Sequence, residues 1–100
     1  MTNYLEPYNP EIANLCAKHK VNKLFAIGSV VRNDFRAESD IDLIVDFDNM
    51  NIEQYADNYF SLKFSLQEVL KKPIDLLEEK AIKNPYFKKA IEQQRQLIYG

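Results

Sequence analysis

Three aspartates stand where they could hold divalent metal ions. Asp40 and Asp42 form an Asp-x-Asp pair at the start of an apolar stretch that is typical of a β-strand. Two residues apart on a strand, their carboxylates point to one face, separated by roughly 6–7 Å along the backbone. Such charges repel each other, and Mg²⁺ would supply the missing counter-charge because it prefers carboxylate and phosphate oxygens. An exposed acidic strand start is the alternative explanation.

The third acid, Asp75, interrupts the apolar run 74–77. An unpaired carboxylate buried in such a run would be costly, so we expect Asp75 to lie beside Asp40 and Asp42 if the two strands are neighbours. Two metal ions about 3.5–4 Å apart need more than one carboxylate bridge, and Asp75 would complete that site. It could also take a proton from an acceptor hydroxyl as a general base. The alternative is an edge aspartate that simply faces water.

A Gly-Ser pair precedes the acids and could bind phosphate. Gly28 lies twelve residues before Asp40. Glycine permits a positive φ and lets the backbone approach a ligand closely. Ser29 offers a hydroxyl, and the amides behind it begin a helix whose N-terminus attracts anions. This turn predicts a cradle for a triphosphate, although the same residues also occur in ordinary turns. Arg32 or Arg36 could clamp a phosphate with its guanidinium group, or could be a solvated loop cation.

Hydrophobic periodicity places these residues around one small sheet. It predicts helices over 9–20, 52–70 and 85–93, a short helix from Ser29 through Asp34, and strands over 23–27, 40–47, 74–77 and 96–99. One face of the second strand carries Ile41, Leu43, Val45 and Phe47, and the other carries Asp40, Asp42, Ile44 and Asp46. The long helix should bury a stripe of Ile52, Tyr55, Tyr59, Leu62, Leu66 and Val69. These elements predict an α/β fold, a mixed sheet of three to four strands flanked by helices, in a single domain over 1–100.

The amino-acid composition limits the kinds of molecule that the chain is expected to bind. The chain has 100 residues, of which 46% are hydrophobic and 28% charged, as in soluble globular proteins. A formal net charge of −2 disfavours nucleic acid as a direct ligand. The single cysteine, Cys16, excludes an intrachain disulfide and is expected in the core. The first twelve residues lack the features of a signal peptide and no apolar run could span a bilayer, so we expect a cytoplasmic protein without membrane contact.

Taken together, the motif resembles the DNA polymerase β-type nucleotidyltransferase superfamily, specifically its minimal nucleotidyltransferase (MNT) branch. The family pattern is a Gly-Ser turn, an arginine-containing loop and Ser-Asp-x-Asp-Leu before an apolar strand. It appears here as Gly28-Ser29, Arg32 and Ser39-Asp40-Ile41-Asp42-Leu43. Asp75 matches the third family carboxylate by its setting in Pro-Ile-Asp-Leu-Leu, and the match covers residues 22–78. Asn33 departs from the glycine that many minimal members carry after the loop arginine.

The resemblance implies nucleotidyl transfer from ATP with two Mg²⁺ ions. It assigns the β- and γ-phosphates to Gly28 and Ser29, nucleotide contacts to Arg32 and Ser39, the metals to Asp40, Asp42 and Asp75, and the acceptor hydroxyl to Asp75. Stand-alone MNT proteins typically pair with a helical HEPN toxin, which implies a hetero-oligomer in which this chain is the antitoxin. In that family the antitoxin neutralises its toxin by transferring AMP to a tyrosine.

Two other functions are compatible with the same residues. The chain could neutralise a HEPN toxin by binding alone, with the carboxylates playing no catalytic part. It could also be the nucleotidyltransferase subunit of an enzyme that modifies a small molecule such as an antibiotic. The presence of all three acids favours catalysis over binding alone, and the lack of an acceptor domain in the sequence weighs against the small-molecule enzyme.

Overall fold

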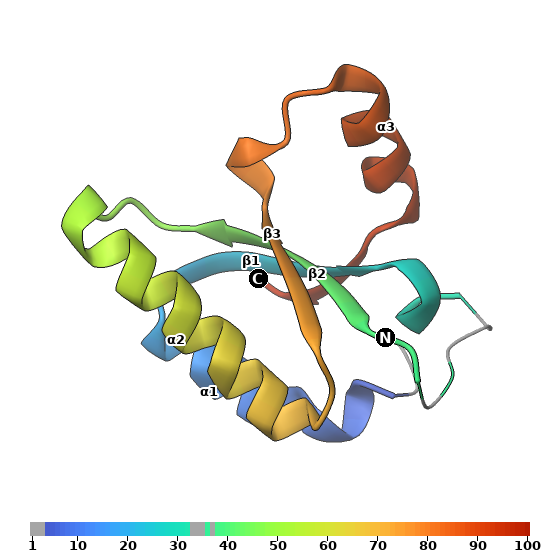
Figure 1. Cartoon of the computed structure of the whole chain (residues 1–100), viewed down its shortest axis with the longest axis horizontal. Helices are drawn as coiled ribbons and strands as arrows, with labels where there is room; N and C mark the ends of the chain where they lie inside the picture. Colours follow the sequence, from blue (N-terminus) through green and yellow to red (C-terminus); the bar gives the residue numbers. More distant parts are fainter. Residues whose placement is uncertain (1–3, 33–35, 37) are drawn as a thin grey trace.

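Four strands form one mixed sheet in the order β3-β2-β1-β4. The computed structural model describes residues 4–32, 36 and 38–100. The strands are β1 (Val21–Ile27), β2 (Ile41–Phe47), β3 (Ile74–Glu78) and β4 (Gln96–Tyr99). The helices are α1 (Asn9–Lys18), α2 (Ile52–Leu70) and α3 (Pro85–Gln94), with short 3₁₀ turns η1 (Glu6–Tyr8), η2 (Gly28–Val30) and η3 (Glu79–Ala81). β2 and β3 run parallel, whereas β1 pairs antiparallel with β2 and β4, so the predicted fold class is confirmed (Figure 1).

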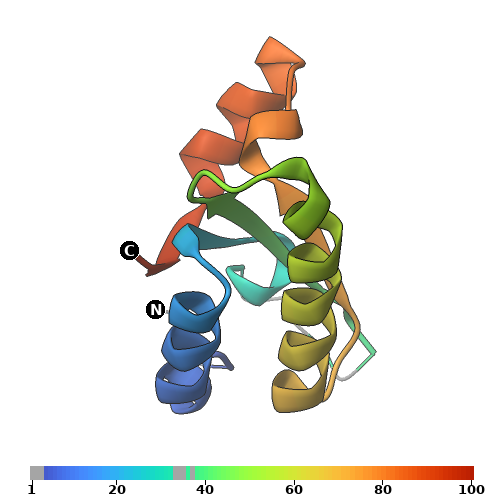
Figure 2. The same ribbon diagram turned by 90° about the vertical axis from the view of Figure 1, so that its left-hand side faces the viewer.

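The sheet separates the helices into two layers. α1 and α2 pack on one face and α3 lies over the other, as Figure 2 shows from the side. The main core under α1 and α2 takes from β2 the side chains of Ile41, Leu43, Val45 and Phe47. A smaller cluster under α3 consists of Phe25, Ile44 and Ile91. The predicted division of the second strand into two faces is therefore confirmed, and the acidic positions lie on the α3 face.

α2 is the crossover that a parallel pair of strands requires. It begins after Asn51, whose side-chain oxygen accepts a hydrogen bond from the Gln54 amide at 2.9 Å, and it ends at Lys71, where φ is 57°. Its fully buried residues are Leu62, Leu66 and Leu70. Ile52 is 88% exposed, so its place in the predicted buried stripe is wrong. The first turn of α2 projects beyond the end of the sheet (Figure 1).

The turn after β1 differs from the prediction. Ser29 does not cap a helix, because η2 begins one residue earlier at Gly28 and has no side-chain cap. Gly28 reverses the chain itself through its φ of 75°. The predicted continuation of this helix to Asp34 lies outside the described residues. β2 begins at Ile41, so Asp40 precedes the strand it was expected to open.

α1 is shorter than predicted and is tied to α2 by a buried histidine. The helix ends at Lys18, and His19 follows it with only 5% of its surface exposed. The ring nitrogens of His19 lie 2.7 Å from the Leu15 carbonyl and 3.0 Å from the Ser61 hydroxyl. Cys16 is a core residue as predicted, and burial raises the pKa of its thiol to about 12. Over the described part of the chain, the structure contains no helix that meets the length and apolarity needed to cross a bilayer.

Candidate functional site

Two of the predicted acids lie side by side in the sheet. Asp42 of β2 and Asp75 of β3 are direct partners in the parallel register. Paired residues on neighbouring strands project to the same face, and this face is opposite the core that takes Ile41 and Leu43. Asp40 lies two positions before Asp42, just ahead of β2. The fold thus brings the three predicted carboxylates to one end of the strand pair.

The electrostatics of Asp42 show that these carboxylates interact. Burial raises the pKa of Asp42 above its ordinary value, and the nearby charges of Asp75 and Asp40 raise it further. The positive charge of Arg32 acts in the opposite direction and lowers that pKa. The net shift is upward, so the folded protein holds an acid in surroundings that disfavour its charge.

The three acids differ in how far they are buried. Asp42 is partly buried, whereas Asp40 and Asp75 are exposed. Asp75 thus lies beside Asp42 as expected, and it also faces water as the alternative explanation has it. β3 is an edge strand, and only its opposite face, which carries Ile74 and Leu76, is covered by the core. As a result Asp75 is open to solvent and to any molecule that approaches this edge.

Gly28 provides the space beside Asp42. The strand register pairs Ile27 with Asp42, which places the turn after β1 against that carboxylate. A Cβ atom added at Gly28 would lie 2.7 Å from Oδ2 of Asp42, closer than two such atoms can approach. The φ of 75° also favours glycine. Glycine at this position therefore keeps the Asp42 carboxylate accessible from the turn.

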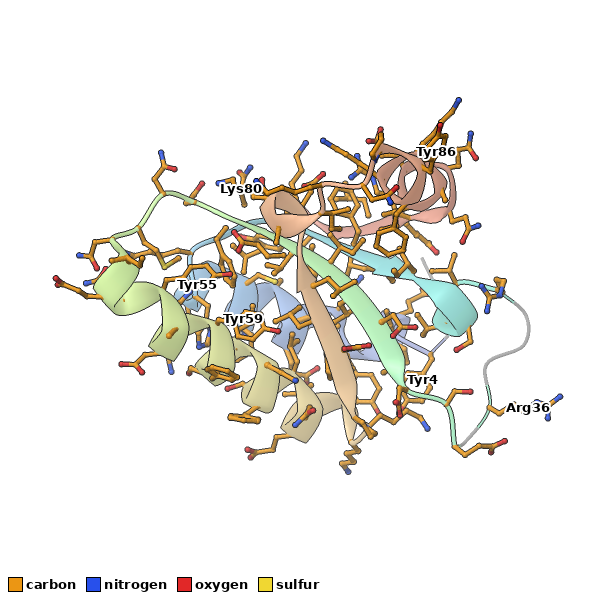
Figure 3. The ribbon with its side chains drawn as sticks, turned by 45° about the horizontal axis from the view of Figure 1, so that its top comes forward. Tyr4, Arg36, Tyr55, Tyr59, Lys80 and Tyr86 are labelled. Carbon is orange, nitrogen blue, oxygen red and sulfur yellow. The ribbon has the colours of Figure 1, made fainter. Side chains whose placement is uncertain are left out.

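The remaining predicted residues occupy the rim. Ser29 is the partly buried second residue of η2, and Arg32 is exposed just after it. The Ser39 hydroxyl accepts a hydrogen bond from the Arg36 amide at 3.1 Å, so its visible role is to close a turn. The Arg36 side chain extends away from the body of the protein, and no contact among the described residues brings it to the acids (Figure 3).

The acids are neighbours but do not yet form a finished metal site. Across the described residues, no group of three or more His, Cys, Asp or Glu side chains is already arranged to hold an ion. The donor set nevertheless suits Mg²⁺, because it consists of hard carboxylate oxygens, two of them in register on adjacent strands. Their mutual repulsion at Asp42 is the strain that a divalent cation would relieve. The residues present therefore fit this class of metal.

Sequence reasoning missed a cavity next to the turn. It has a volume of about 320 Å³ and is lined by Gly28, Val31, Arg32 and Gln94. Gln94 is the last residue of α3, more than fifty positions from Asp42 along the chain. No local pattern marks this glutamine, because its position depends on how α3 is laid over the sheet. Only the folded chain brings it to the Gly-Ser turn.

Comparison with known proteins agrees with this geometry. The family model described as "Polymerase beta, Nucleotidyltransferase" matches residues 10–100. The chain belongs to this nucleotidyltransferase family. Among curated relatives, "Putative protein adenylyltransferase MJ1379" of Methanocaldococcus jannaschii is 40% identical over 82 residues, which span 82% of this chain and 79% of the relative. The resemblance to nucleotidyltransferases of this kind is thus confirmed.

Solved structures show the same architecture as this nucleotidyltransferase. A structure described as a "putative minimal nucleotidyltransferase" matches with a TM-score of 0.76 and 25% identity, covering 92% of this chain and 90% of that one. The structure of a tri-AMPylated Shewanella oneidensis HEPN toxin in complex with its MNT antitoxin matches with a TM-score of 0.65 and 18% identity. That match covers 95% of this chain and 71% of the other, and at this identity it speaks for the fold alone.

Proposed function

We propose that this nucleotidyltransferase transfers AMP from ATP to a hydroxyl group of a protein, in a reaction that needs Mg²⁺. The observation that carries the proposal is the register of Asp42 with Asp75, next to a turn whose glycine leaves the Asp42 carboxylate uncovered. The acceptor is a tyrosine of a HEPN-type toxin, and the chain acts as its antitoxin. Support for this acceptor comes from the adenylyltransferase relatives and from the fold shared with an MNT antitoxin whose HEPN partner is AMPylated.

The acids and the turn divide the work at the nucleotide. Asp40, Asp42 and Asp75 would hold two Mg²⁺ ions, which when bound neutralise the charge of the triphosphate and of the departing pyrophosphate. The Ser29 hydroxyl and the backbone at Gly28 would bind the β- and γ-phosphates. Ser39, directly before Asp40, would make a further contact to the nucleotide. The positive charge of Arg32 lowers the pKa of Asp42, and its guanidinium would bind a phosphate oxygen.

For the transfer itself, the protein has to position the two substrates and to provide one proton acceptor. The tyrosine oxygen forms a bond to the α-phosphorus, and the bond from that phosphorus to the oxygen bridging the β-phosphate breaks. Pyrophosphate leaves with the bonding electrons, and the proton of the tyrosine passes to the Asp75 carboxylate. Asp75 suits this part because it is exposed on an edge strand, where a large acceptor can reach it.

The open setting of the acids favours a protein acceptor over a small molecule. A small acceptor needs walls that enclose it, since ligand pockets bury most of the surface of what they bind. Asp40 and Asp75 are instead exposed. A protein partner would bring its own surface to cover the site and to exclude water during transfer.

The decisive test is transfer of label from α-labelled ATP to the HEPN partner in the presence of Mg²⁺. We expect the parent chain to label one or more tyrosines, and the Asp40→Ala, Asp42→Ala double variant to label none. Asp57→Asn is the matched control, because Asp57 is an exposed carboxylate on α2, on the far side of the sheet. Transfer that survives the double substitution, or label that never appears, would refute the enzymatic proposal. If the double variant still neutralises the toxin, binding alone accounts for the antitoxin.

A further inference from the structure

The cavity beside the Gly-Ser turn has the size and lining of a nucleoside site. Its volume of about 320 Å³ is at the small end of the range for ligand pockets, which suits a base with its ribose. Gly28 belongs both to this cavity and to the turn that lies against Asp42. A nucleoside is joined directly to the α-phosphate, the group that reacts beside the three acids, so its site must lie close to Asp42. The cavity satisfies that requirement.

We infer that this cavity holds the nucleoside of the substrate, and that Gln94 makes the enzyme prefer adenine to guanine. The inference rests on the proposed function and adds to it the site of the base and the residue that recognises it. The Gln94 side chain carries an amide, with an N–H₂ donor and a carbonyl acceptor side by side. Adenine matches that pair along one edge with its N7 acceptor and N6 donor, whereas guanine presents two acceptors there. Guanine therefore leaves the amide carbonyl without a donor.

The other residues of the cavity suit the rest of the nucleoside. Val31 gives an apolar surface on which a base can pack. Arg32 lines the cavity, and its positive charge also lowers the pKa of Asp42. It is therefore placed at the junction of base and phosphate, where a cation would favour the α-phosphate.

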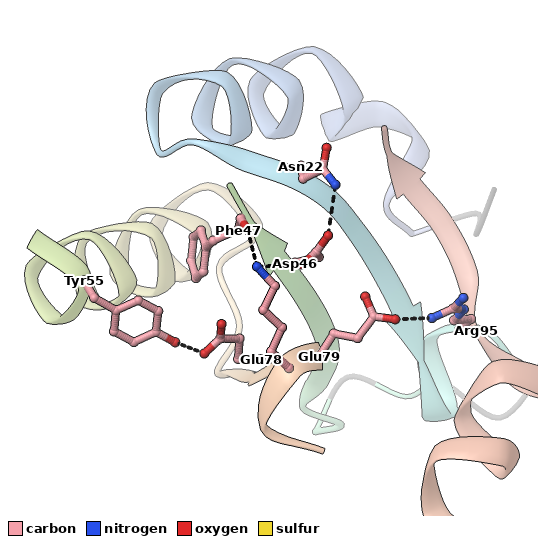
Figure 4. A network of polar contacts seen from close by, with 8 residues as sticks. Asn22, Asp46, Phe47, Tyr55, Glu78, Glu79 and Arg95 are labelled. Carbon is pink, nitrogen blue, oxygen red and sulfur yellow. Dashed lines mark hydrogen bonds and ion pairs between the residues drawn. The ribbon is translucent and has the colours of Figure 1, made fainter. Parts of the chain in front are cut away.

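The structure also shows what holds Gln94 in place. The next residue, Arg95, lies with its guanidinium 4.1 Å from the centre of the Phe25 ring and donates a hydrogen bond to Glu79 at 2.8 Å (Figure 4). One turn earlier, Ile91 is buried against Phe25 and Ile44. These contacts fasten the end of α3 to the sheet, so the glutamine starts from a fixed backbone position and loses little freedom when it binds.

The test is a calorimetric titration of the whole chain with ATP and with GTP, each in the presence of Mg²⁺. We expect the parent to bind ATP about tenfold more tightly, the scale of one paired amide contact to a base. Gln94→Ala should bring the two affinities together, mainly by weakening ATP. Gln93→Ala is the matched control, because Gln93 is the same residue type in the same last turn of α3 and does not line the cavity. It should keep the preference.

A third ligand separates the base from the phosphates. Inorganic tripolyphosphate with Mg²⁺ should bind the parent, Gln93→Ala and Gln94→Ala alike. If the parent binds ATP and GTP equally, or if Gln94→Ala keeps the preference, the assignment of Gln94 is wrong while the proposed function stands. Loss of tripolyphosphate binding in Gln94→Ala would equally overturn it, since the residue would then act on the phosphates or the fold. If the parent binds no nucleotide at all, the proposed function fails as well.

Discussion

The two ends of β2 each carry an aspartate on the same face, and their surroundings are opposite. Asp46 accepts a hydrogen bond from the Asn22 side chain at 2.9 Å, and its other oxygen lies 3.7 Å from the Lys80 ammonium (Figure 4). Asp42, four residues earlier, faces Asp75 and has its pKa raised by burial and by two other carboxylates. On one strand, therefore, Asp46 has a cation and a hydrogen-bond donor beside it, whereas Asp42 lies among other carboxylates that repel its charge.

This difference separates a structural acid from a functional one. Lys80 also donates a hydrogen bond to the Phe47 carbonyl at 3.1 Å, so it fixes the chain at the Asp46 end of the strand. At the Asp42 end, the positive charge of Arg32 only partly offsets the effect of the neighbouring acids on the Asp42 pKa. A fold that keeps like charges together gives up stability, and such arrangements are common where a ligand supplies the missing charge. The same residue type on the same strand face therefore has two different roles.

The strongest way to break the comparison is to neutralise each acid in turn. Asp42→Asn should lower the rate of AMP transfer roughly a thousandfold or more, equivalent to about 4 kcal/mol of transition-state stabilisation, because a metal-binding carboxylate is lost. Asp46→Asn should leave the rate within about twofold, since its partners are Asn22 and Lys80. Single-turnover transfer to the partner protein measures both. Equal losses in the two variants would mean that the ends of β2 do not differ in function.

A substitution at Gly28 should disturb only the Asp42 end. Gly28→Ala introduces a side chain 2.7 Å from Oδ2 of Asp42 at a φ of 75°, and we expect a loss of about 1–3 kcal/mol of stability together with reduced transfer. Urea unfolding measures the first effect. In the background of Asp42→Ala, which removes that oxygen, the same substitution should cost less because only the backbone strain remains. Strictly additive effects would show that the two residues do not collide.

The features of the two ends of β2 can be predicted from the sequence only where they depend on local sequence patterns. The alternation along 41–47 and the Asp-x-Asp spacing are local, so the faces of β2 and the nearness of Asp40 to Asp42 could be predicted. The position of Asp75 beside them depends on the pairing of β3 with β2, so it could be predicted only on the condition that these strands are neighbours. The exposure of Asp75 could not, because it follows from β3 being at the edge of the sheet. Ile52 was misplaced for a related reason: its periodicity is helical, but the sheet does not extend far enough to cover it.

Contacts between residues from distant segments could not be predicted from the sequence. Lys80 reaches Asp46 from η3, and Gln94 reaches the Gly-Ser turn from the end of α3. Neither pairing has a fixed spacing or a periodic pattern. Both depend on the path of the chain after β3, which the hydrophobic pattern fixes only as a helix and an edge strand.

The pH dependence of stability should also distinguish the two ends. The folded pKa of Asp42 is raised, so its protonated form is favoured in the folded state. The stability it contributes is complete below the ordinary aspartate pKa of about 3.9, and is lost as the pH rises through the raised value. Asp42→Asn should therefore match the parent at low pH and become the more stable protein as the pH rises above that range. Urea unfolding at a series of pH values, without divalent cations, measures this.

Adding Mg²⁺ sharpens that measurement. A cation that binds the ionised acids stabilises the folded parent by mass action, so the advantage of Asp42→Asn should shrink or reverse. Asp46→Asn should gain from Mg²⁺ as much as the parent does. A parent protein that is indifferent to Mg²⁺ at every pH would contradict a metal role for the Asp42 end.

The smallest effect is expected at the Asp46 end itself. Lys80→Met removes the ion pair with Asp46 and the hydrogen bond to the Phe47 carbonyl, but the Lys80 side chain is 57% exposed, so the loss of stability should be no more than about 1 kcal/mol. Lys83→Met, at an exposed lysine three residues later, is the matched control. The difference between the two variants should narrow in high salt, because screening weakens the exposed pair in the parent. AMP transfer should be unchanged in both variants. A reduced rate in Lys80→Met would show that the Asp46 end of β2 also serves the reaction.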